Sequence, residues 1–113
     1  MTEDMKSTNA AHSGPQKPKA IKIDSNDNVA TVYADITPGY IHYISGSESL
    51  SVSVTESIPS GHKVALNDIP ENTPIIKYGV TIGVSTRYIQ KGSWVHLHNC
   101  KSKYDEQHHE KHE

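Results

Sequence analysis

The sequence contains no phenylalanine, one tryptophan and one cysteine among its 113 residues. With Cys100 as the only cysteine, no disulfide can form within the chain. No stretch approaches the roughly 18 consecutive apolar residues that a membrane-spanning helix requires. The start of the chain, Met1–Ser13, also lacks the apolar run of a signal peptide. These absences favour a soluble protein of the cytoplasm.

A surplus of basic residues is missing as well. Lys and Arg total 11 against 13 Asp and Glu, which gives a formal net charge of −2. Because proteins that bind nucleic acids or anionic membranes need an excess of positive charge, the composition argues against both kinds of partner. The sequence also lacks a phosphate-binding glycine-rich loop, a Gly-x-Ser-x-Gly elbow and a paired-cysteine zinc motif.

The two ends of the chain differ in composition from the middle. Residues 1–19 combine small polar residues, two prolines and scattered charges without a hydrophobic period, so we expect a disordered arm. Residues 103–113 are mostly charged or histidine and predict a second polar tail, which also resembles an affinity tag. The middle, residues 20–102, has room for one small domain. No clear internal repeat is visible in it.

The middle of the chain has a hydrophobic period of two and is rich in β-branched residues. In the clearest run, Leu50–Thr55, three aliphatic side chains alternate with three hydroxyls, and we expect the aliphatic face in the core. Turn formers such as Pro38-Gly39 and Lys91-Gly92 separate such runs. The other expected strands are Ala20–Ile23, Val29–Tyr33, Tyr40–Ile44, Lys63–Leu66, Ile75–Tyr78, Thr81–Val84 and Trp94–Asn99. This pattern predicts an all-β fold, either a compact sandwich or a clip-like barrel.

The strongest candidate for chemistry is the segment Trp94–Asn99. If it is a strand, His96 and His98 lie on one face, about 7 Å apart along the chain. Neutral imidazoles bind borderline divalent metals well, so this pair could supply two ligands while another segment supplies the rest. The alternative is a pair of partly exposed strand histidines with no ligand, and the spacing alone favours this alternative.

Two further basic positions lie next to turns. His62 and Lys63 follow the turn Pro59-Ser60-Gly61, where a side chain can serve as base, acid or substrate clamp. Lys77 stands before Tyr78-Gly79 at the end of an expected strand and could neutralise a carboxylate. The alternatives are a solvated turn pair and an ordinary charged strand edge, and on sequence alone both are favoured.

Two further residues and the last segment of the chain are given no part in the chemistry. Trp94 is expected in the core or at an interface rather than stacked on a substrate. Cys100 has no basic arrangement around it beyond Lys101 and is assigned no role. The segment His108–Glu113 has metal-binding atoms but no rigid frame, so it is read as a polar tail.

Several segments resemble a known family when they are taken together. They are Ile58–Ile69, Ile76–Gly79, Ile82-Gly83 and Trp94–Asn99, preceded by Asp27–Ala30, which fits an expected first strand. Their order and spacing resemble the small SAF-type domain of the altronate/galactarate dehydratase family. The resemblance covers most of residues 20–102 and neither tail. It implies a β-clip fold, in agreement with the all-β pattern.

The resemblance also implies an activity and a partner. Family members remove water from a sugar acid by β-elimination to give a 2-keto-3-deoxy acid, with a divalent metal, expected to be Fe²⁺. Because 113 residues leave no room for the large catalytic domain, the chain is expected to be a small subunit that needs a large dehydratase subunit and a hydroxy-acid substrate. A homo-oligomer is left open. The end of the match, Asn99–Lys103, also resembles the alpha subunit of (2R)-sulfolactate sulfo-lyase, which is one alternative. A non-catalytic SAF module that binds carbohydrate or protein, or that only scaffolds an oligomer, is another.

The implied chemistry suggests roles for individual residues. Removing a proton next to a carboxylate creates a dianion that a cation must stabilise. Carried over to matching positions, the resemblance makes His62, His96 and His98 candidates for catalysis, with His96 and His98 as metal ligands. It makes Lys77 a candidate for holding the substrate carboxylate and Asn99 a candidate for hydrogen bonding to the substrate.

Overall fold

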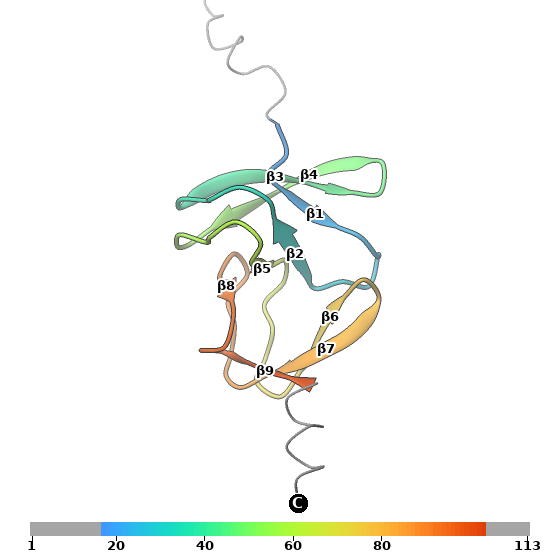
Figure 1. Cartoon of the computed structure of the whole chain (residues 1–113), viewed down its shortest axis with the longest axis vertical. Helices are drawn as coiled ribbons and strands as arrows, with labels where there is room; N and C mark the ends of the chain where they lie inside the picture. The colour runs from blue at the N-terminus through green and yellow to red at the C-terminus, as the bar shows by residue number, and fades with distance from the viewer. Residues whose placement is uncertain (1–16, 104–113) are drawn as a thin grey trace, which may run out of the picture.

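The computed structural model describes residues 17–103 as two β-sheets joined by loops (Figure 1). The first sheet has the order β4-β3-β1-β2-β5-β8 and the second has the order β6-β7-β9. The strands of the first sheet are β1 (Ala20–Lys22), β2 (Val29–Val32), β3 (Gly39–Ser45), β4 (Glu48–Val54), β5 (Lys63–Ala65) and β8 (Trp94–Val95). Those of the second are β6 (Pro74–Lys77), β7 (Val80–Ser85) and β9 (Cys100–Ser102). All neighbours are antiparallel except β1 and β3.

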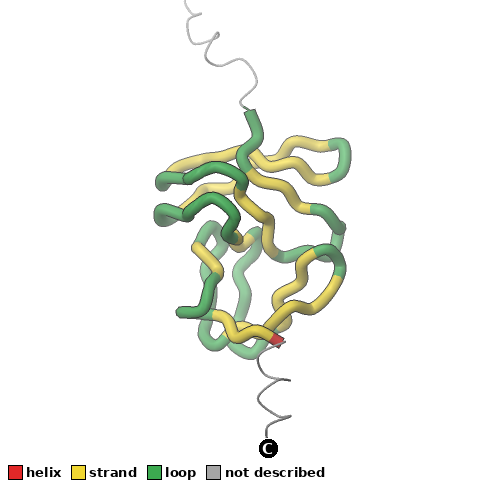
Figure 2. Tube along the Cα trace, viewed as in Figure 1, coloured by secondary structure: helices red, strands yellow, loops and turns green. Residues whose placement is uncertain are grey.

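The predicted all-β fold is confirmed. Apart from the strands, the described chain consists of loops and turns, and it is helical only at Lys103 (Figure 2). No helix within residues 17–103 has the length and apolar character needed to cross a membrane. The predicted disordered arm and polar tail lie outside the described residues, except for residues 17–19 and Lys103.

The alternating run in β4 is paired with β3 along its whole length. Val52 and Val54 are buried as expected, but Leu50 is 39% exposed. The prediction that all three aliphatic side chains enter the core is therefore wrong for Leu50. The reason is position, because Leu50 lies on β4, the edge strand of the first sheet, and pairs with Tyr43 near the turn of the hairpin.

The interior consists of two clusters of aliphatic side chains. The first cluster lies on the six-stranded sheet and includes Val32, Val52 and Val64. The second joins the two sheets, because it combines Ile75 of β6 with Val95 of β8 and residues of the intervening loops. Burying these side chains supplies the main favourable term in folding a domain of this size.

A polar connection also holds the sheets together. Asp27, in the turn between β1 and β2, is 3% exposed and its carboxylate accepts a hydrogen bond from the Gly79 N–H at 2.8 Å. The neighbouring Asn28 accepts from the Ile76 N–H at 2.8 Å and donates to the Pro74 carbonyl at 2.9 Å. The hairpin of β6 and β7 is thereby fixed against the first sheet.

The structure contains an internal repeat, contrary to the expectation from sequence. In the first copy, Ile36 and Ile58 exchange backbone hydrogen bonds of 2.9 and 3.0 Å. In the second copy, Ile69 and Ile89 exchange two of 2.8 Å. All four isoleucines are buried. The repeat is hard to see in sequence because only a few positions of each copy need a particular residue.

Those few positions are an aspartate before the first isoleucine and a glycine after the second. Asp35 accepts from the Ser60 N–H at 2.9 Å, and Asp68 accepts in the same way from the Lys91 N–H at 2.8 Å. The glycines that follow, Gly61 and Gly92, have φ of 90° and 91°, in the left-handed region that favours glycine. Strand β5 leaves the first copy and β8 leaves the second, and these two strands pair with each other.

Candidate functional site

The segment that carries His96 and His98 is a tight turn and not a strand. The predicted strand Trp94–Asn99 is wrong beyond Val95, where β8 ends. The Asn99 N–H donates to the His96 carbonyl at 3.1 Å, and the Asn99 side-chain oxygen accepts from the His96 N–H at 3.0 Å. The asparagine side chain takes the place of a strand partner and reverses the chain, which asparagine does readily in turns.

Asn99 is therefore an organising residue of this turn. Its Nδ2 also donates to the Trp94 carbonyl at 2.8 Å, and the residue is only 5% exposed. Both ends of the side-chain amide are used in holding the turn that presents the histidines. Its predicted hydrogen bond to the substrate stays a prediction.

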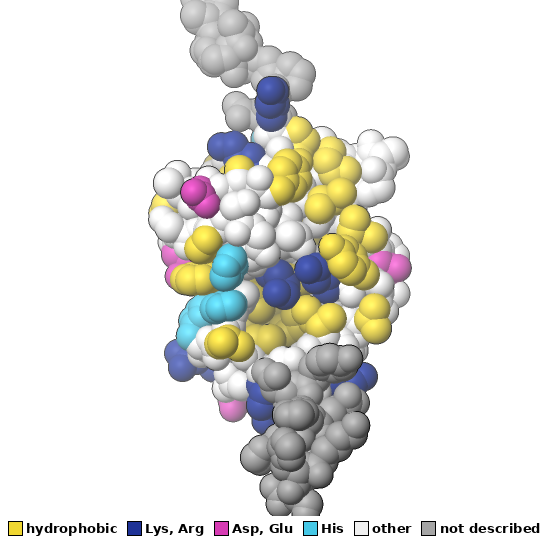
Figure 3. Space-filling model, in the orientation of Figure 1, with side chains coloured by type: hydrophobic (Ala, Val, Ile, Leu, Met, Phe, Trp, Pro, Cys, Tyr) yellow, Lys and Arg dark blue, Asp and Glu magenta, His cyan; other side chains and the backbone are white. Residues whose placement is uncertain are grey.

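The three candidate histidines nevertheless gather at one place, around the ring of Trp94. The His96 ring stacks on the indole with centroids 5.5 Å apart and planes 10° apart, and the His98 ring lies 5.4 Å from it. The His62 and His96 rings are 4.7 Å apart. Histidine side chains form one group on the face of the molecule in Figure 3. The turn after β8 and the start of β5 thus bring imidazoles from distant parts of the sequence together.

A hydrogen bond fixes the chemical state of His62. The indole Nε1–H of Trp94 lies 3.2 Å from Nδ1 of His62. Because an indole nitrogen can only donate, Nδ1 must be the accepting nitrogen of a neutral imidazole, and the ring proton must be on Nε2. His62 therefore offers an N–H at Nε2, which suits donation to an oxygen and does not suit ligation of a metal.

His96 is suited to accept a proton, whereas His62 is suited to donate one. Its partial burial lowers its pKa below the ordinary value of 6.5, and positive charge on the nearby Lys63 and His98 lowers it further. His96 is thus mostly neutral near pH 7 and can accept a proton. It is partly exposed, so a substrate can reach it.

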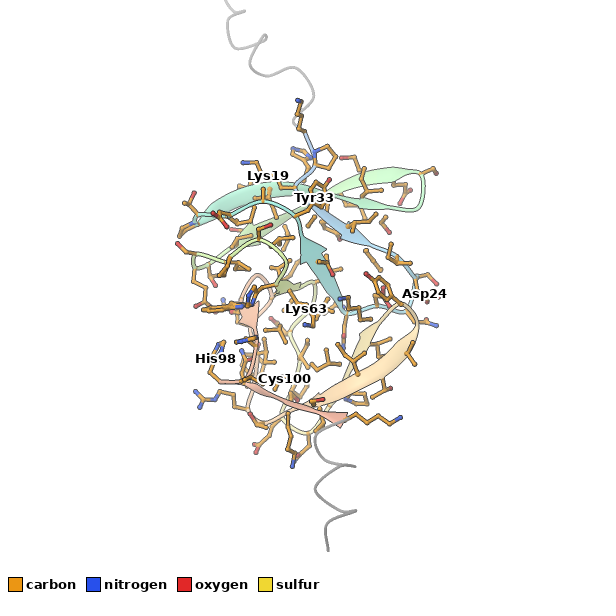
Figure 4. All side chains as sticks on the ribbon, viewed as in Figure 1. Lys19, Asp24, Tyr33, Lys63, His98 and Cys100 are labelled. Atoms are coloured by element: carbon orange, nitrogen blue, oxygen red, sulfur yellow. The ribbon has the colours of Figure 1, made fainter. Side chains whose placement is uncertain are left out.

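A cleft of about 280 Å³ opens beside these histidines. Its lining residues are Lys63, Ile82, Val95, His96, Leu97, Cys100 and Ser102. Lys63 begins β5 and Cys100 begins β9, so the cleft lies where the two sheets approach each other. Figure 4 shows Lys63, His98 and Cys100 on the same side of the molecule. Lys77 is not a lining residue, and its Nζ lies 4.9 Å from the centroid of the Tyr78 ring. Its role in holding a substrate carboxylate stays a prediction.

Sequence reasoning missed the importance of two residues at this site. Trp94 packs against the first core cluster, in line with the expectation of a core or interface residue, but its ring also contacts all three histidines. Lys63 was considered with His62 as a possible base, acid or substrate clamp, but a solvated turn pair was favoured, whereas Lys63 is a half-buried cation of the cleft. One signal was present in the sequence, since a lysine that opens an otherwise buried strand is unusual for a small domain.

The described residues do not by themselves fit a metal centre. Within residues 17–103 no three His, Cys, Asp or Glu side chains are placed to hold a metal ion. His62 cannot join His96 and His98 as a ligand in the state described above, because Nδ1 is used by Trp94 and Nε2 carries the proton.

Comparison with known proteins gives consistent matches. Residues 18–103 match the family model described as the altronate/galactarate dehydratase SAF domain. Altronate dehydratase of Bacillus subtilis (strain 168) is 40% identical over 82 residues, covering 73% of this chain and 16% of that protein. Galactarate dehydratase (L-threo-forming) of Escherichia coli (strain K12) is 44% identical over 77 residues, covering 66% of this chain and 14% of the relative. The (2R)-sulfolactate sulfo-lyase subunit alpha of Chromohalobacter salexigens is 44% identical over 55 residues, covering 49% of this chain and 58% of that subunit.

Proposed function

Because this chain belongs to the altronate/galactarate dehydratase SAF-domain family, we propose that it acts as the small subunit of a cytoplasmic sugar-acid hydro-lyase. The match spans only 16% and 14% of the length of the two dehydratases compared above. In this proposal a large dehydratase subunit supplies the remaining catalytic machinery. Leu97, which is 71% exposed between His96 and His98, is an apolar side chain that such a partner would cover.

The observation that carries the proposal is the pair of unlike imidazoles, His62 and His96, with their rings 4.7 Å apart. Elimination of water needs a base to remove the proton next to the carboxylate and a donor to protonate the departing hydroxyl. His96, which is neutral near pH 7, is the candidate base. His62 has its proton on Nε2 and is the candidate donor. His98 is exposed and stands at the rim, where a second chain or an ion would meet it.

A divalent metal, expected to be Fe²⁺, belongs to the proposal only with help from another chain. His96 and His98 are the imidazoles that this chain would contribute to it. Since residues 17–103 hold no group of three suitable ligands, the remaining ligands would have to come from the large subunit.

A second candidate is the alpha subunit of a (2R)-sulfolactate sulfo-lyase. The observation in its favour is length, because the match covers 58% of the Chromohalobacter salexigens subunit but only 16% of the Bacillus subtilis altronate dehydratase. The same two imidazoles would then serve an elimination in which sulfite leaves instead of water.

The decisive experiment is co-expression with a large dehydratase chain, followed by assays with altronate, galactarate and sulfolactate. Loss of about 10²–10⁴-fold in rate is expected for His96→Ala, as for removal of a general base. His42→Ala, in β3, is the matched control and should retain activity. Full activity in His62→Ala and His96→Ala would overturn the catalytic proposal and leave a non-catalytic binding module.

A further inference from the structure

The cleft beside the histidines contains a cation, and the residues that line it within the described range 17–103 include no carboxylate. Lys63 is half-buried at the start of β5 and lines the cleft together with His96 and Cys100. The remaining walls include the apolar side chains of Ile82 and Val95. An ammonium group held against apolar walls has lost part of its water shell, which raises the free energy of the folded chain unless an anion compensates it.

The charged groups around Lys63 do not provide that compensation. Among the residues that the structure describes, Lys77 acts on it as a second positive charge, and Cys100 acts in the opposite direction. Burial raises the pKa of the Cys100 thiol above its ordinary value of 9.0, so the thiol is uncharged near pH 7 and supplies no anion. His96, which is mostly neutral near pH 7, supplies no anion either.

Concentrated positive potential in a partly dry cleft is the usual design of an anion-binding site. We infer that this cleft is a binding site for a small organic anion, in which the Lys63 ammonium pairs with a carboxylate or sulfonate of the ligand. Its neighbour His96 then lies against the part of the ligand next to that anionic group. Lys77 contributes positive potential from outside the cleft, without lining it.

This inference rests on the proposed function and refines it. It assigns the carboxylate contact to Lys63, where the sequence had suggested Lys77. It also explains why a chain of net charge −2 would keep a half-buried lysine close to a second lysine. Residues at ligand sites often lower the stability of the free protein, because their charges are arranged for the bound state.

The test is titration of the whole chain without any partner, followed by ¹H–¹⁵N NMR and by thermal unfolding at constant ionic strength. Galactarate should raise Tm and shift amide signals clustered at residues 63, 96 and 100. Galactitol, which has the same carbon chain without carboxylates, should do neither. Lactate carries a carboxylate and 2-hydroxyethanesulfonate carries a sulfonate. Whichever of these two ligands binds more tightly shows which anionic group the cleft prefers.

Lys63→Met provides the specific variant, and Lys91→Met, at an exposed turn, is its control. Lys63→Met should weaken anion binding by at least about tenfold, as expected for removal of a charged partner, while raising the Tm of the free chain. Lys63→Gln repeats the measurement with a polar side chain if the methionine variant folds poorly. Anion binding that is unchanged in Lys63→Met or Lys63→Gln, or equal effects of galactarate and galactitol, would overturn the site.

The outcome separates this inference from the enzyme assignment. If the chain binds anions through Lys63 but shows no activity with the large dehydratase chain, the anion site is supported and the hydro-lyase assignment is overturned. If the complex is active but Lys63→Met leaves anion binding unchanged, the hydro-lyase assignment is supported and the anion site is overturned.

Discussion

The indole N–H of Trp94 donates to Nδ1 of His62 across 3.2 Å, and the two residues lie on the paired strands β8 and β5 or directly beside them. This contact selects one tautomer of His62 before any ligand arrives. It also leaves the His62 and His96 rings in edge-to-face contact, with centroids 4.7 Å apart. One aromatic side chain thereby sets both the orientation and the proton position of the site.

The first prediction concerns that contact. Trp94→Phe keeps an aromatic ring against His96 and His98 but removes the indole N–H that donates to Nδ1 of His62. We expect His62 to populate both tautomers, and the activity of the complex to fall by about 10–100-fold, as for loss of an orienting partner. Long-range ¹H–¹⁵N spectra of the histidine rings measure the tautomer directly. His42 serves as an internal reference, and an unchanged His62 tautomer would contradict the role given to Trp94.

The second prediction concerns Asn99. Asn99→Ala leaves the His96 N–H and the Trp94 carbonyl without their side-chain partner. We expect a loss of about 1–3 kcal/mol in the free energy of unfolding, because a buried polar group loses its hydrogen bond. Denaturant titration measures the loss, and Asn67→Ala at an exposed position is the control. Stability equal to that of the unmodified chain would mean that the turn after β8 does not depend on this side chain.

The third prediction concerns acid stability. Burial of Asp27 favours a higher pKa, but hydrogen bonds from the backbone N–H groups of Gly79 and Asp24 outweigh it and hold the pKa below the ordinary 3.8. Because the folded state holds the proton less tightly than the unfolded state, the stabilisation by the charged form is complete above about pH 3.8 and is lost as the pH falls through the lower, folded value.

Asp27→Asn tests this directly. At pH 7 it should lower the free energy of unfolding by about 1.5–3 kcal/mol, the usual contribution of hydrogen bonds to a charged group. The difference from the unmodified chain should shrink as the pH falls below 3.8. Glu48→Gln, at the exposed start of β4, controls for the change in net charge. A difference that stays constant with pH would exclude Asp27 as the group responsible.

The fourth prediction concerns the wall of the cleft. A Cβ at Gly83 would lie 2.5 Å from the Lys101 carbonyl oxygen and 3.1 Å from the Cys100 sulfur, so Gly83→Ala must push β9 away from β7. We expect a loss of about 1–3 kcal/mol, as for overpacking, and weaker anion binding in the cleft. Val80→Ala, exposed on the same strand, is the control. Anion titration and thermal unfolding measure both effects, and unaltered binding would show that β9 does not shape the cleft.

Much of the fold follows from local pattern. Alternating β-branched residues place β2, β3, β5 and β7 close to their observed positions, because half-buried strands impose a period of two. The same rule failed at Trp94–Asn99, where the alternation continues but the Asn99 side chain closes a turn. Whether an asparagine side chain bonds to its own loop or points to solvent depends on the three-dimensional setting, which the alternation does not encode.

The site was only partly predictable for a similar reason. The three histidines stood out by residue type, and the structure gathers all three around Trp94. The tautomer of His62 and the uncompensated charge of Lys63 depend on which residues β5, β8 and β9 bring together. Neither property is encoded within a short stretch of sequence.

The two copies of the internal repeat give the domain an approximate two-fold symmetry, and the paired strands β5 and β8 lie at its centre. The residues that follow Gly61 and Gly92 therefore occupy equivalent positions in the two copies. They are His62 in the first copy and Ser93 in the second. Their carbonyls accept matching hydrogen bonds, from Val32 and Ala65, of 2.9 Å each. A symmetric scaffold thus carries an asymmetric set of side chains, so that one half can diverge in chemistry while the other preserves the backbone on which both depend.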